Sequence, residues 1–158
     1  MNKPVITVVG AVLQDDQGRV LLAQRPPDKS MPYLWEFPGG QVEKDESPEN
    51  ALARELYEEI GLVVLPSNFK PFTFVSLAYP DFHIILLVYR CLEWTGTPQA
   101  REGQEGIEWI LPKDLPHYPM PAANCALIPL LQGEQGSDQK SERGEITDDH
   151  PFFENLSQ

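Results

Sequence analysis

The chain has 158 residues and a formal net charge of −12, and this length corresponds to one domain. With 41% apolar residues, one hydrophobic core can form without metals or disulfides. The excess of acidic residues argues against binding to nucleic-acid polymers, because that affinity comes from clustered Lys and Arg. A nucleotide substrate stays compatible with the charge, since metal ions can lie between carboxylates and phosphates.

The negative charge is concentrated in two segments. Residues 40–62 hold seven acidic and two basic residues, a net charge of −5, and residues 133–158 hold the same numbers. The second segment is dominated by Gly, Ser, Gln and charged residues, a composition typical of disorder. We therefore expect a folded domain over residues 1–132 and an acidic, disordered C-terminal tail over 133–158.

Six apolar runs rich in β-branched and aromatic residues predict β-strands. They cover residues 5–13, 20–23, 34–37, 69–77, 82–92 and 108–110. The first two are separated by turn-forming residues, so we predict a β-hairpin. The fifth is almost continuously apolar, and we expect it to be buried on both faces.

Two helices are predicted among these strands. Residues 47–49, Ser-Pro-Glu, suit a helix start, and Gly61 suits its C-terminal stop, so the first helix is expected to run to about Ile60. The second covers residues 122–131, with Pro129 limiting its length. Strands around one early and one late helix predict an α+β fold, a mixed sandwich.

The first predicted helix carries three glutamates on one side. Glu55 precedes Glu58 by three residues and Glu59 by four, so the three carboxylates share or adjoin one face. Like charges about 6 Å apart repel by about 3 kcal/mol per pair at an effective dielectric constant near 20. A divalent cation would relieve this repulsion, and oxygen ligands favour Mg²⁺ or Mn²⁺. The same run can also be an ordinary solvated helix face.

The residues around these glutamates form a longer pattern. Gly40, Glu46 and residues 54–62 (Arg-Glu-Leu-Tyr-Glu-Glu-Ile-Gly-Leu) match G-x5-E-x7-R-E-U-x-E-E-x-G-U, the Nudix box, in which U is apolar. A chance match is on the order of 10⁻⁹ per starting point under ordinary composition. The chain therefore resembles the Nudix hydrolases, and over residues 5–131 it is most similar to the MutT-type 8-oxo-dGTP diphosphatases.

The resemblance implies an α/β/α sandwich and a metal-dependent hydrolysis of nucleoside triphosphates to a monophosphate and pyrophosphate. By position, Glu55, Glu58, Glu59 and the Gly39 carbonyl would be Mg²⁺ ligands, and Arg54 would orient the glutamates. In this scheme Glu46 braces the loop of the box. A further glutamate in a distant loop completes the MutT-type site, and Glu102 matches it. The resemblance leaves both Glu55 and Glu102 as candidates for the general base.

The resemblance also implies a substrate-binding site for 8-oxo-dGTP. The residues assigned to it by position are Arg25, for phosphate, and Phe37, Tyr79, Phe82, Ile84 and Asn124, for the base. An Asn amide can pair with both the O6 acceptor and the N7–H donor of 8-oxoguanine. The alternative interpretation is that Asn124 caps the last helix and the aromatic residues belong to the core.

Two positions depart from many bacterial relatives. Gln41 stands where they have Lys, and Phe82 stands where a polar residue can contact the base. A sister group that hydrolyses CTP or modified pyrimidine triphosphates shares much of the preceding sequence and is the alternative function. A non-catalytic nucleotide-binding regulatory module is the alternative from another class.

The expected partner is thus a small nucleotide, with no nucleic-acid polymer, no membrane and no obligate protein partner. The N-terminal apolar run is too short for a signal peptide, and no run approaches the length of a membrane span. We therefore expect a cytoplasmic protein.

Overall fold

The structure, a computed structural model, describes residues 3–101, 103 and 105–135. The candidate residue Glu102 and most of the acidic segment 133–158 lie outside the described residues. No helix in the described part of the chain is long and apolar enough to cross a bilayer.

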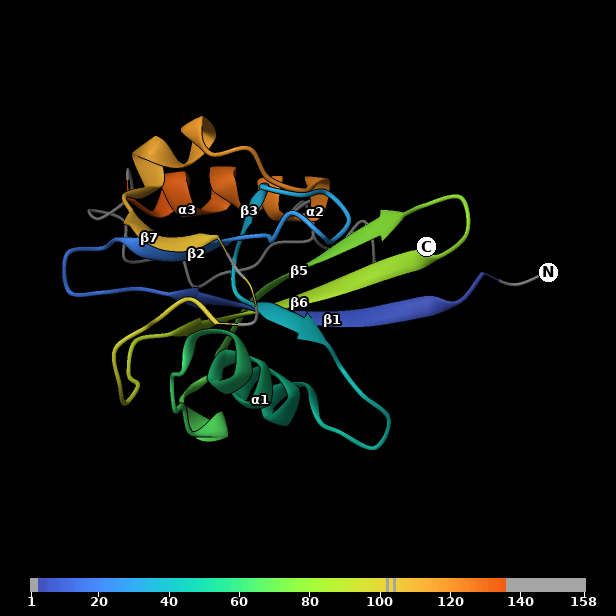
Figure 1. Cartoon of the computed structure of the whole chain (residues 1–158), viewed down its shortest axis with the longest axis horizontal. Helices are drawn as coiled ribbons and strands as arrows, with labels where there is room; N and C mark the ends of the chain where they lie inside the picture. The colour runs from blue at the N-terminus through green and yellow to red at the C-terminus, as the bar shows by residue number, and fades with distance from the viewer. Residues whose placement is uncertain (1–2, 102, 104, 136–158) are drawn as a thin grey trace.

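Two β-sheets form the middle of the molecule (Figure 1). The four-stranded sheet has the order β4-β1-β6-β5, with β1 (Val5–Leu13), β4 (Gly39–Gln41), β5 (Lys70–Ala78) and β6 (His83–Cys91). The three-stranded sheet has the order β3-β2-β7, with β2 (Val20–Gln24), β3 (Trp35–Glu36) and β7 (Gly106–Ile110). Strands β1 and β6 are parallel, and the other described pairs are antiparallel.

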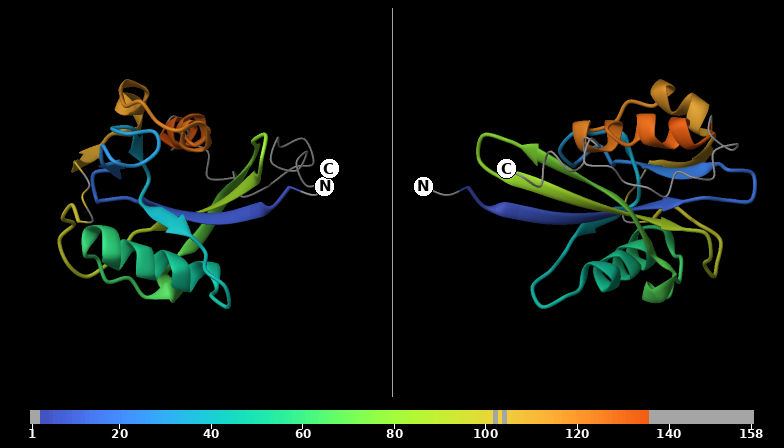
Figure 2. Two further views of the ribbon diagram at one scale, coloured as in Figure 1. Left: turned by 45° about the vertical axis from the view of Figure 1, so that its right-hand side comes forward. Right: turned by 180° about the vertical axis from the view of Figure 1, so that it is seen from behind.

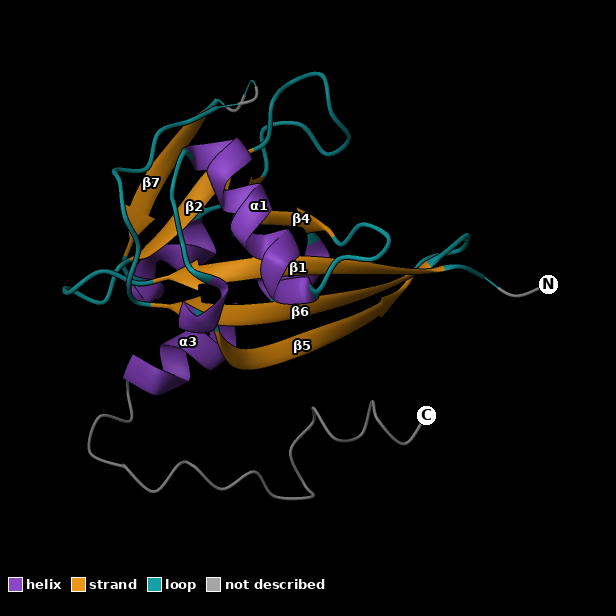
Figure 3. Ribbon diagram, turned by 90° about the horizontal axis from the view of Figure 1, so that it is seen from below, coloured by secondary structure: helices purple, strands orange, loops and turns teal. Residues whose placement is uncertain are grey.

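Helices cover these sheets on both sides. Helix α1 (Pro48–Ile60) lies on one face of the four-stranded sheet, and Figure 3 shows its strands side by side behind this helix. The three-stranded sheet, α2 (Ala122–Cys125) and α3 (Ile128–Gln135) lie on the other face (Figures 1 and 2). Two 3₁₀ helices, η1 (Pro66–Asn68) and η2 (Pro112–His117), complete the described elements. These layers confirm the predicted α+β sandwich.

The hydrophobic core has two parts, one on each face of the four-stranded sheet. In β1, Val9, Ala11 and Leu13 pack in the part that contains α1, and Val12 packs in the other. This alternation follows from the two-residue period of a strand. Burying each large aliphatic side chain contributes about 1.5–3 kcal/mol, so both faces of β1 hold the layers together.

Helix α1 begins and ends where the sequence predicts. The Ser47 Oγ accepts a hydrogen bond from the Asn50 N–H at 3.1 Å, and Pro48 occupies the first turn. At the other end Gly61 has φ 75°, a left-handed conformation that favours glycine. The Gly61 and Leu62 N–H groups then donate to carbonyls of the last turn.

The predicted hairpin between β1 and β2 is wrong, although both strands are present. The two strands belong to different sheets, and the described residues show only a single bridge, Gln14 to Val20, at their turn. β1 pairs instead with β4 and β6, and β2 pairs with β3 and β7. The apolar pattern identifies a buried strand, but it does not identify its partner.

Two further predictions need correction. The expected helix over 122–131 is two helices, and Pro129 lies in the first turn of the second, where its missing N–H costs nothing. Helix α3 then continues past residue 132 to Gln135. Strand β6 is only half-buried over residues 83–85, because this end of the sheet extends beyond the helices (Figure 1).

Strand β4 lies against the backbone of β1. Gly39 pairs with Gly10, and a Cβ atom added at Gly39 would overlap the Val9 carbonyl oxygen. Backbone atoms cannot move aside as the end of a long side chain can. Glycine is therefore required at residue 39 for the two strands to approach.

We expect Gly39→Ala to lower the free energy of unfolding by about 3 kcal/mol or more, because β4 must move away from β1. The measurement is urea denaturation followed by circular dichroism. Gly106→Ala is the matched control, since a Cβ at Gly106 meets nothing within 4 Å. Equal stabilities of the two variants would contradict the close approach of β4 and β1.

Candidate functional site

A cavity of about 600 Å³ lies between α1, the four-stranded sheet and the loop that follows β2. Ten of the twelve residues predicted for the site line it: Arg25, Phe37, Gly39, Arg54, Glu55, Glu58, Glu59, Phe82, Ile84 and Asn124. Tyr79 does not line it, and Glu102 lies outside the described residues. The fold thus brings the predicted metal-binding and base-binding residues to one cavity.

Arg54 connects the glutamates on the α1 side of the cavity. Its Nε and Nη2 donate to the two carboxylate oxygens of Glu46 at 2.8 and 3.0 Å. Its Nη1 donates to Glu55 at 2.9 Å and to Glu58 at 3.4 Å. The hydrogen bonds from Arg54 lower the pKa of Glu46 to about 2, so Glu46 stays charged at neutral pH. The predicted ion pairing by Arg54 and bracing by Glu46 are both present.

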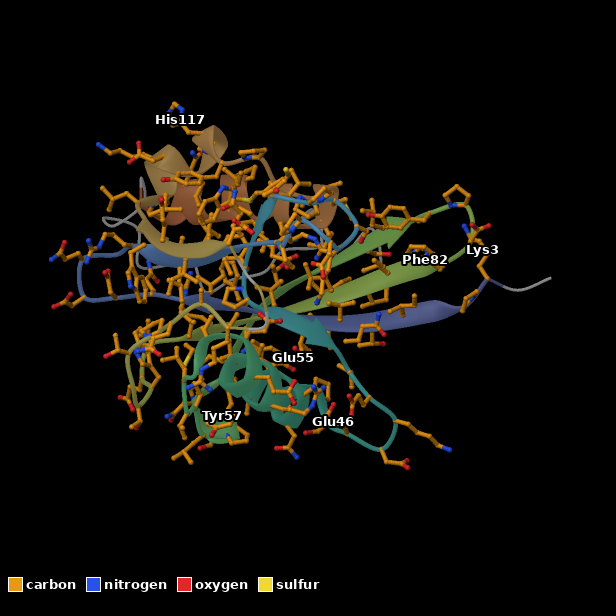
Figure 4. The ribbon with its side chains drawn as sticks, viewed as in Figure 1. Lys3, Glu46, Glu55, Tyr57, Phe82 and His117 are labelled. Carbon is orange, nitrogen blue, oxygen red and sulfur yellow. The ribbon has the colours of Figure 1, made fainter. Side chains whose placement is uncertain are left out.

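Glu55 and Glu59 form a carboxyl pair at the cavity. Their carboxyl groups lie close enough to act directly on each other. Burial raises the pKa of Glu55, and burial and the neighbouring charges of Glu55 and Glu36 raise the pKa of Glu59 well above its ordinary range. The Glu59 carboxylate also accepts a hydrogen bond from the Gly39 backbone. In Figure 4, Glu55 lies on the sheet side of α1, and Glu46 and Tyr57 lie on its outer side.

This carboxyl pair fits a divalent cation. Two carboxyl groups that lie side by side and are partly buried offer oxygen ligands to a cation, which would also offset their mutual repulsion. Among the described residues, no three acidic, His or Cys side chains converge as a complete metal cluster, and both Glu55 and Glu58 are bonded to Arg54. Glu55, Glu58 and Glu59 are the predicted ligands of such an ion, and all three line the cavity.

The sheet side of the cavity is an apolar slot. Its lining includes side chains of β1, β6 and the segment before β4: Ile6, Val8, Phe37, Ile84, Leu86 and Val88. Asn124 brings an amide to this slot, and its Oδ1 accepts a hydrogen bond from the Phe37 N–H at 3.0 Å. Asn124 lies within α2, whose N-cap residue Pro121 has no side-chain cap hydrogen bond, so the helix-cap part of the alternative is wrong, whereas Phe37 does belong to the core. A slot with one fixed amide can receive a flat heterocycle.

Phe82 and Tyr79 lie at the tip of the β5–β6 hairpin. Their rings stack with centroids 4.8 Å apart, and Phe82 lines the cavity whereas Tyr79 does not. Figure 4 shows Phe82 at the end of β6 that extends beyond the helices. Tyr79 therefore supports the ring of Phe82 rather than facing the cavity.

The loop after β2 contributes residues that the sequence analysis missed. The Arg25 Nη1 pairs with Glu36 at 3.1 Å, and its Nε and Nη2 donate to the Ser30 carbonyl and hydroxyl groups. Burial raises the pKa of Glu36. The sequence contained a signal for the Arg25–Glu36 pair, because Glu36 is the one acidic residue in the otherwise apolar run of residues 34–37. Lys29 also lines the cavity from this loop.

The C-terminal end of α1 is held by the segment before β7. The Gln99 and Arg101 N–H groups donate to the carbonyls of Ile60 and Glu59 at 2.9 Å, and the Arg101 guanidinium lies over the Tyr57 ring. Helix α1 has no basic residue in its last turn, so Arg101 supplies the favourable positive charge there. This contact fixes the turn that carries Glu58 and Glu59.

Comparisons with known proteins identify the family of the chain. The model of the NUDIX domain matches residues 5–131. The chain is 39% identical over 134 residues to the 8-oxo-dGTP diphosphatase of Haemophilus influenzae, covering 85% of this chain and 96% of that protein. It is 38% identical over 128 residues to the CTP pyrophosphohydrolase of Escherichia coli, covering 81% and 90%.

A solved structure from a study of MutT from Aliivibrio salmonicida and Vibrio cholerae has the same fold. The TM-score is 0.70 at 30% identity, and the match covers 82% of this chain and 98% of that one. The Nudix box extends from β4 through α1 to Leu62, and the family model matches residues 5–131, so the protein belongs to the Nudix hydrolase family.

Proposed function

We propose that the protein hydrolyses 8-oxo-dGTP to 8-oxo-dGMP and pyrophosphate, with Mg²⁺ as its metal and Mn²⁺ as a substitute. The observation that carries this proposal is the single cavity that joins the acidic side of α1 to the slot of Asn124. The relatives named as 8-oxo-dGTP diphosphatases support it. Removal of this nucleotide would prevent its incorporation into DNA.

Asn124 is the residue proposed to recognise the oxidised base. Its Oδ1 is oriented by the Phe37 N–H and keeps one lone pair, while its NH₂ group keeps its donors. 8-Oxoguanine presents the O6 acceptor beside an N7–H donor, which matches this amide. Guanine has an acceptor at N7, so one polar group in the slot would lose its partner, and buried unpaired groups reduce binding strongly.

The glutamates of α1 are proposed to hold the metal near the phosphates. Nudix hydrolases need a divalent metal, which neutralises phosphate oxygens and makes a bound water more acidic. Glu55, Glu58 and Glu59 would hold it together with the Gly39 carbonyl. Arg54 keeps Glu55 in position, and Glu55 or Glu102 would accept the proton of the attacking water. Water adds to phosphorus, and the phosphoanhydride bond to pyrophosphate breaks.

The decisive experiment compares substrates. We expect kcat/KM for 8-oxo-dGTP to exceed that for dGTP by about 100-fold or more, because only the oxidised base satisfies the amide. Pyrophosphate release is measured for 8-oxo-dGTP, dGTP and CTP with Mg²⁺. Asn124→Ala should remove most of this preference. A higher kcat/KM for CTP would establish the alternative function, and no turnover of any nucleotide would favour the regulatory module.

The metal assignment is tested on the glutamates themselves. We expect Glu58→Gln and Glu59→Gln each to lower kcat by about 100-fold or more, because an amide is a weaker ligand than a carboxylate. Mn²⁺ binding followed by electron paramagnetic resonance should weaken in both variants. Glu93→Gln, an exposed residue that does not line the cavity, is the control. Unchanged Mn²⁺ affinity in Glu59→Gln would refute the assignment.

The Gly40→Ala variant tests whether the position of Glu55 affects activity without a change in the stability of the fold. A Cβ at Gly40 would overlap the Glu55 carboxyl group, which is the end of a flexible side chain and can move. We therefore expect a loss of about 10-fold or more in kcat, with a melting temperature near that of the wild type. Gly39→Ala should instead lower the melting temperature. Wild-type activity of Gly40→Ala would show that the position of Glu55 does not matter.

A further inference from the structure

The cavity has three cationic residues in its lining, and two of them are already paired. Arg54 bonds to Glu46, Glu55 and Glu58. Arg25, which was expected to contact phosphate, has a bond from each of its guanidinium nitrogens to Ser30 or Glu36. Lys29 is the third. Within the described residues, its ammonium group makes no hydrogen bond and no ion pair within 4 Å, although its charge is a lesser cause that acts to lower the pKa of Glu36.

The loop that carries Lys29 has a defined shape. The Lys29 N–H donates to the Pro26 carbonyl, and the Tyr33 N–H donates to the Arg25 carbonyl. Met31 and Tyr33 have left-handed backbone conformations, with φ 51° and 65°. Such conformations cost about 1–3 kcal/mol each and persist only where the surrounding contacts hold them, commonly at functional sites. The contacts of Arg25 with Ser30 and Glu36 supply this hold and keep Lys29 at the cavity.

The lining of the cavity has a net negative charge, so binding of a phosphate chain there requires a cation that is not held in an ion pair. Five glutamates and three cations line it, Glu36, Glu43, Glu55, Glu58 and Glu59 against Arg25, Lys29 and Arg54. A nucleoside triphosphate adds several negative charges, of which bound metal neutralises only those beside the glutamates. Gln41 on β4 is neutral. A lysine on a flexible stem is a suitable ligand for phosphate oxygens.

We propose that Lys29 binds the phosphate chain of the substrate, and that Arg25 is a positioning residue that holds the Lys29 loop. This inference rests on the proposed nucleoside triphosphate hydrolysis but not on the identity of the base. Lys29 thereby contributes to the preference for triphosphates over nucleotides with shorter phosphate chains.

The test uses steady-state kinetics with the nucleotide that the wild-type enzyme hydrolyses fastest. We expect Lys29→Ala to raise KM about 10-fold, equivalent to about 1.4 kcal/mol, with kcat changed by less than about twofold. Lys29→Arg should restore most of the affinity, because it keeps the charge. Lys113→Ala, an exposed lysine on η2 outside the cavity lining, should match the wild type.

A second measurement distinguishes a direct ionic contact from a structural effect. The wild-type KM should rise with NaCl concentration more steeply than the KM of Lys29→Ala, because salt screens the contact that the variant lacks. An unchanged KM in Lys29→Ala, or equal salt dependence in both proteins, overturns the proposal. A defect in Lys29→Arg as large as that in Lys29→Ala also overturns it. If the fastest substrate proves to be CTP, the base assignment fails while this test stays valid.

Discussion

The ion pairs of Arg54 determine how the acidic side of the cavity is built. The helical period places Glu55, Glu58 and Glu59 close together, and their mutual repulsion opposes that arrangement. Arg54 supplies the opposing charge and binds Glu46 through two hydrogen bonds, while its Nη2 also donates to the Gln41 carbonyl. One side chain therefore ties α1, the preceding loop and β4 into a unit, against which Glu55 packs over Gly40.

The local elements could be predicted because their causes are local. The limits of α1 follow from Ser47, Pro48 and Gly61, whose capping preferences act within a few residues. The pairing of a strand, in contrast, depends on residues far away in the sequence. β1 and β2 have the same apolar pattern that a hairpin has, yet they join different sheets, and β1 pairs along its whole length with β6, which is far away in the sequence. The residues of the two strands alone therefore do not determine which strands they pair with.

The same distinction applies to the site. Residues 54–59 could be assigned because their spacing fixes them on one helix, and Phe37, Ile84 and Asn124 line the cavity as expected. Lys29 and Glu36 were missed, since their positions depend on a loop in which Met31 and Tyr33 adopt left-handed conformations. Neither residue type favours that conformation, so only the contacts of Arg25 reveal the shape of the loop.

The two sides of the cavity come from different elements. The residues proposed to bind metal are therefore separate from those proposed to select the base. The glutamates lie on α1, whereas the slot is formed by β1, β6 and α2. Relatives named for 8-oxo-dGTP and for CTP match this chain at 39% and 38% identity, so overall similarity does not distinguish their substrates. The distinction must come from a few side chains in the slot. Asn124 is the residue proposed for this choice, because its Oδ1 is oriented by the Phe37 N–H, two residues before Gly39. The proposed base-recognition and metal-binding residues thus meet at the start of β4, where a correctly bound base would set the position of the phosphates relative to the glutamates.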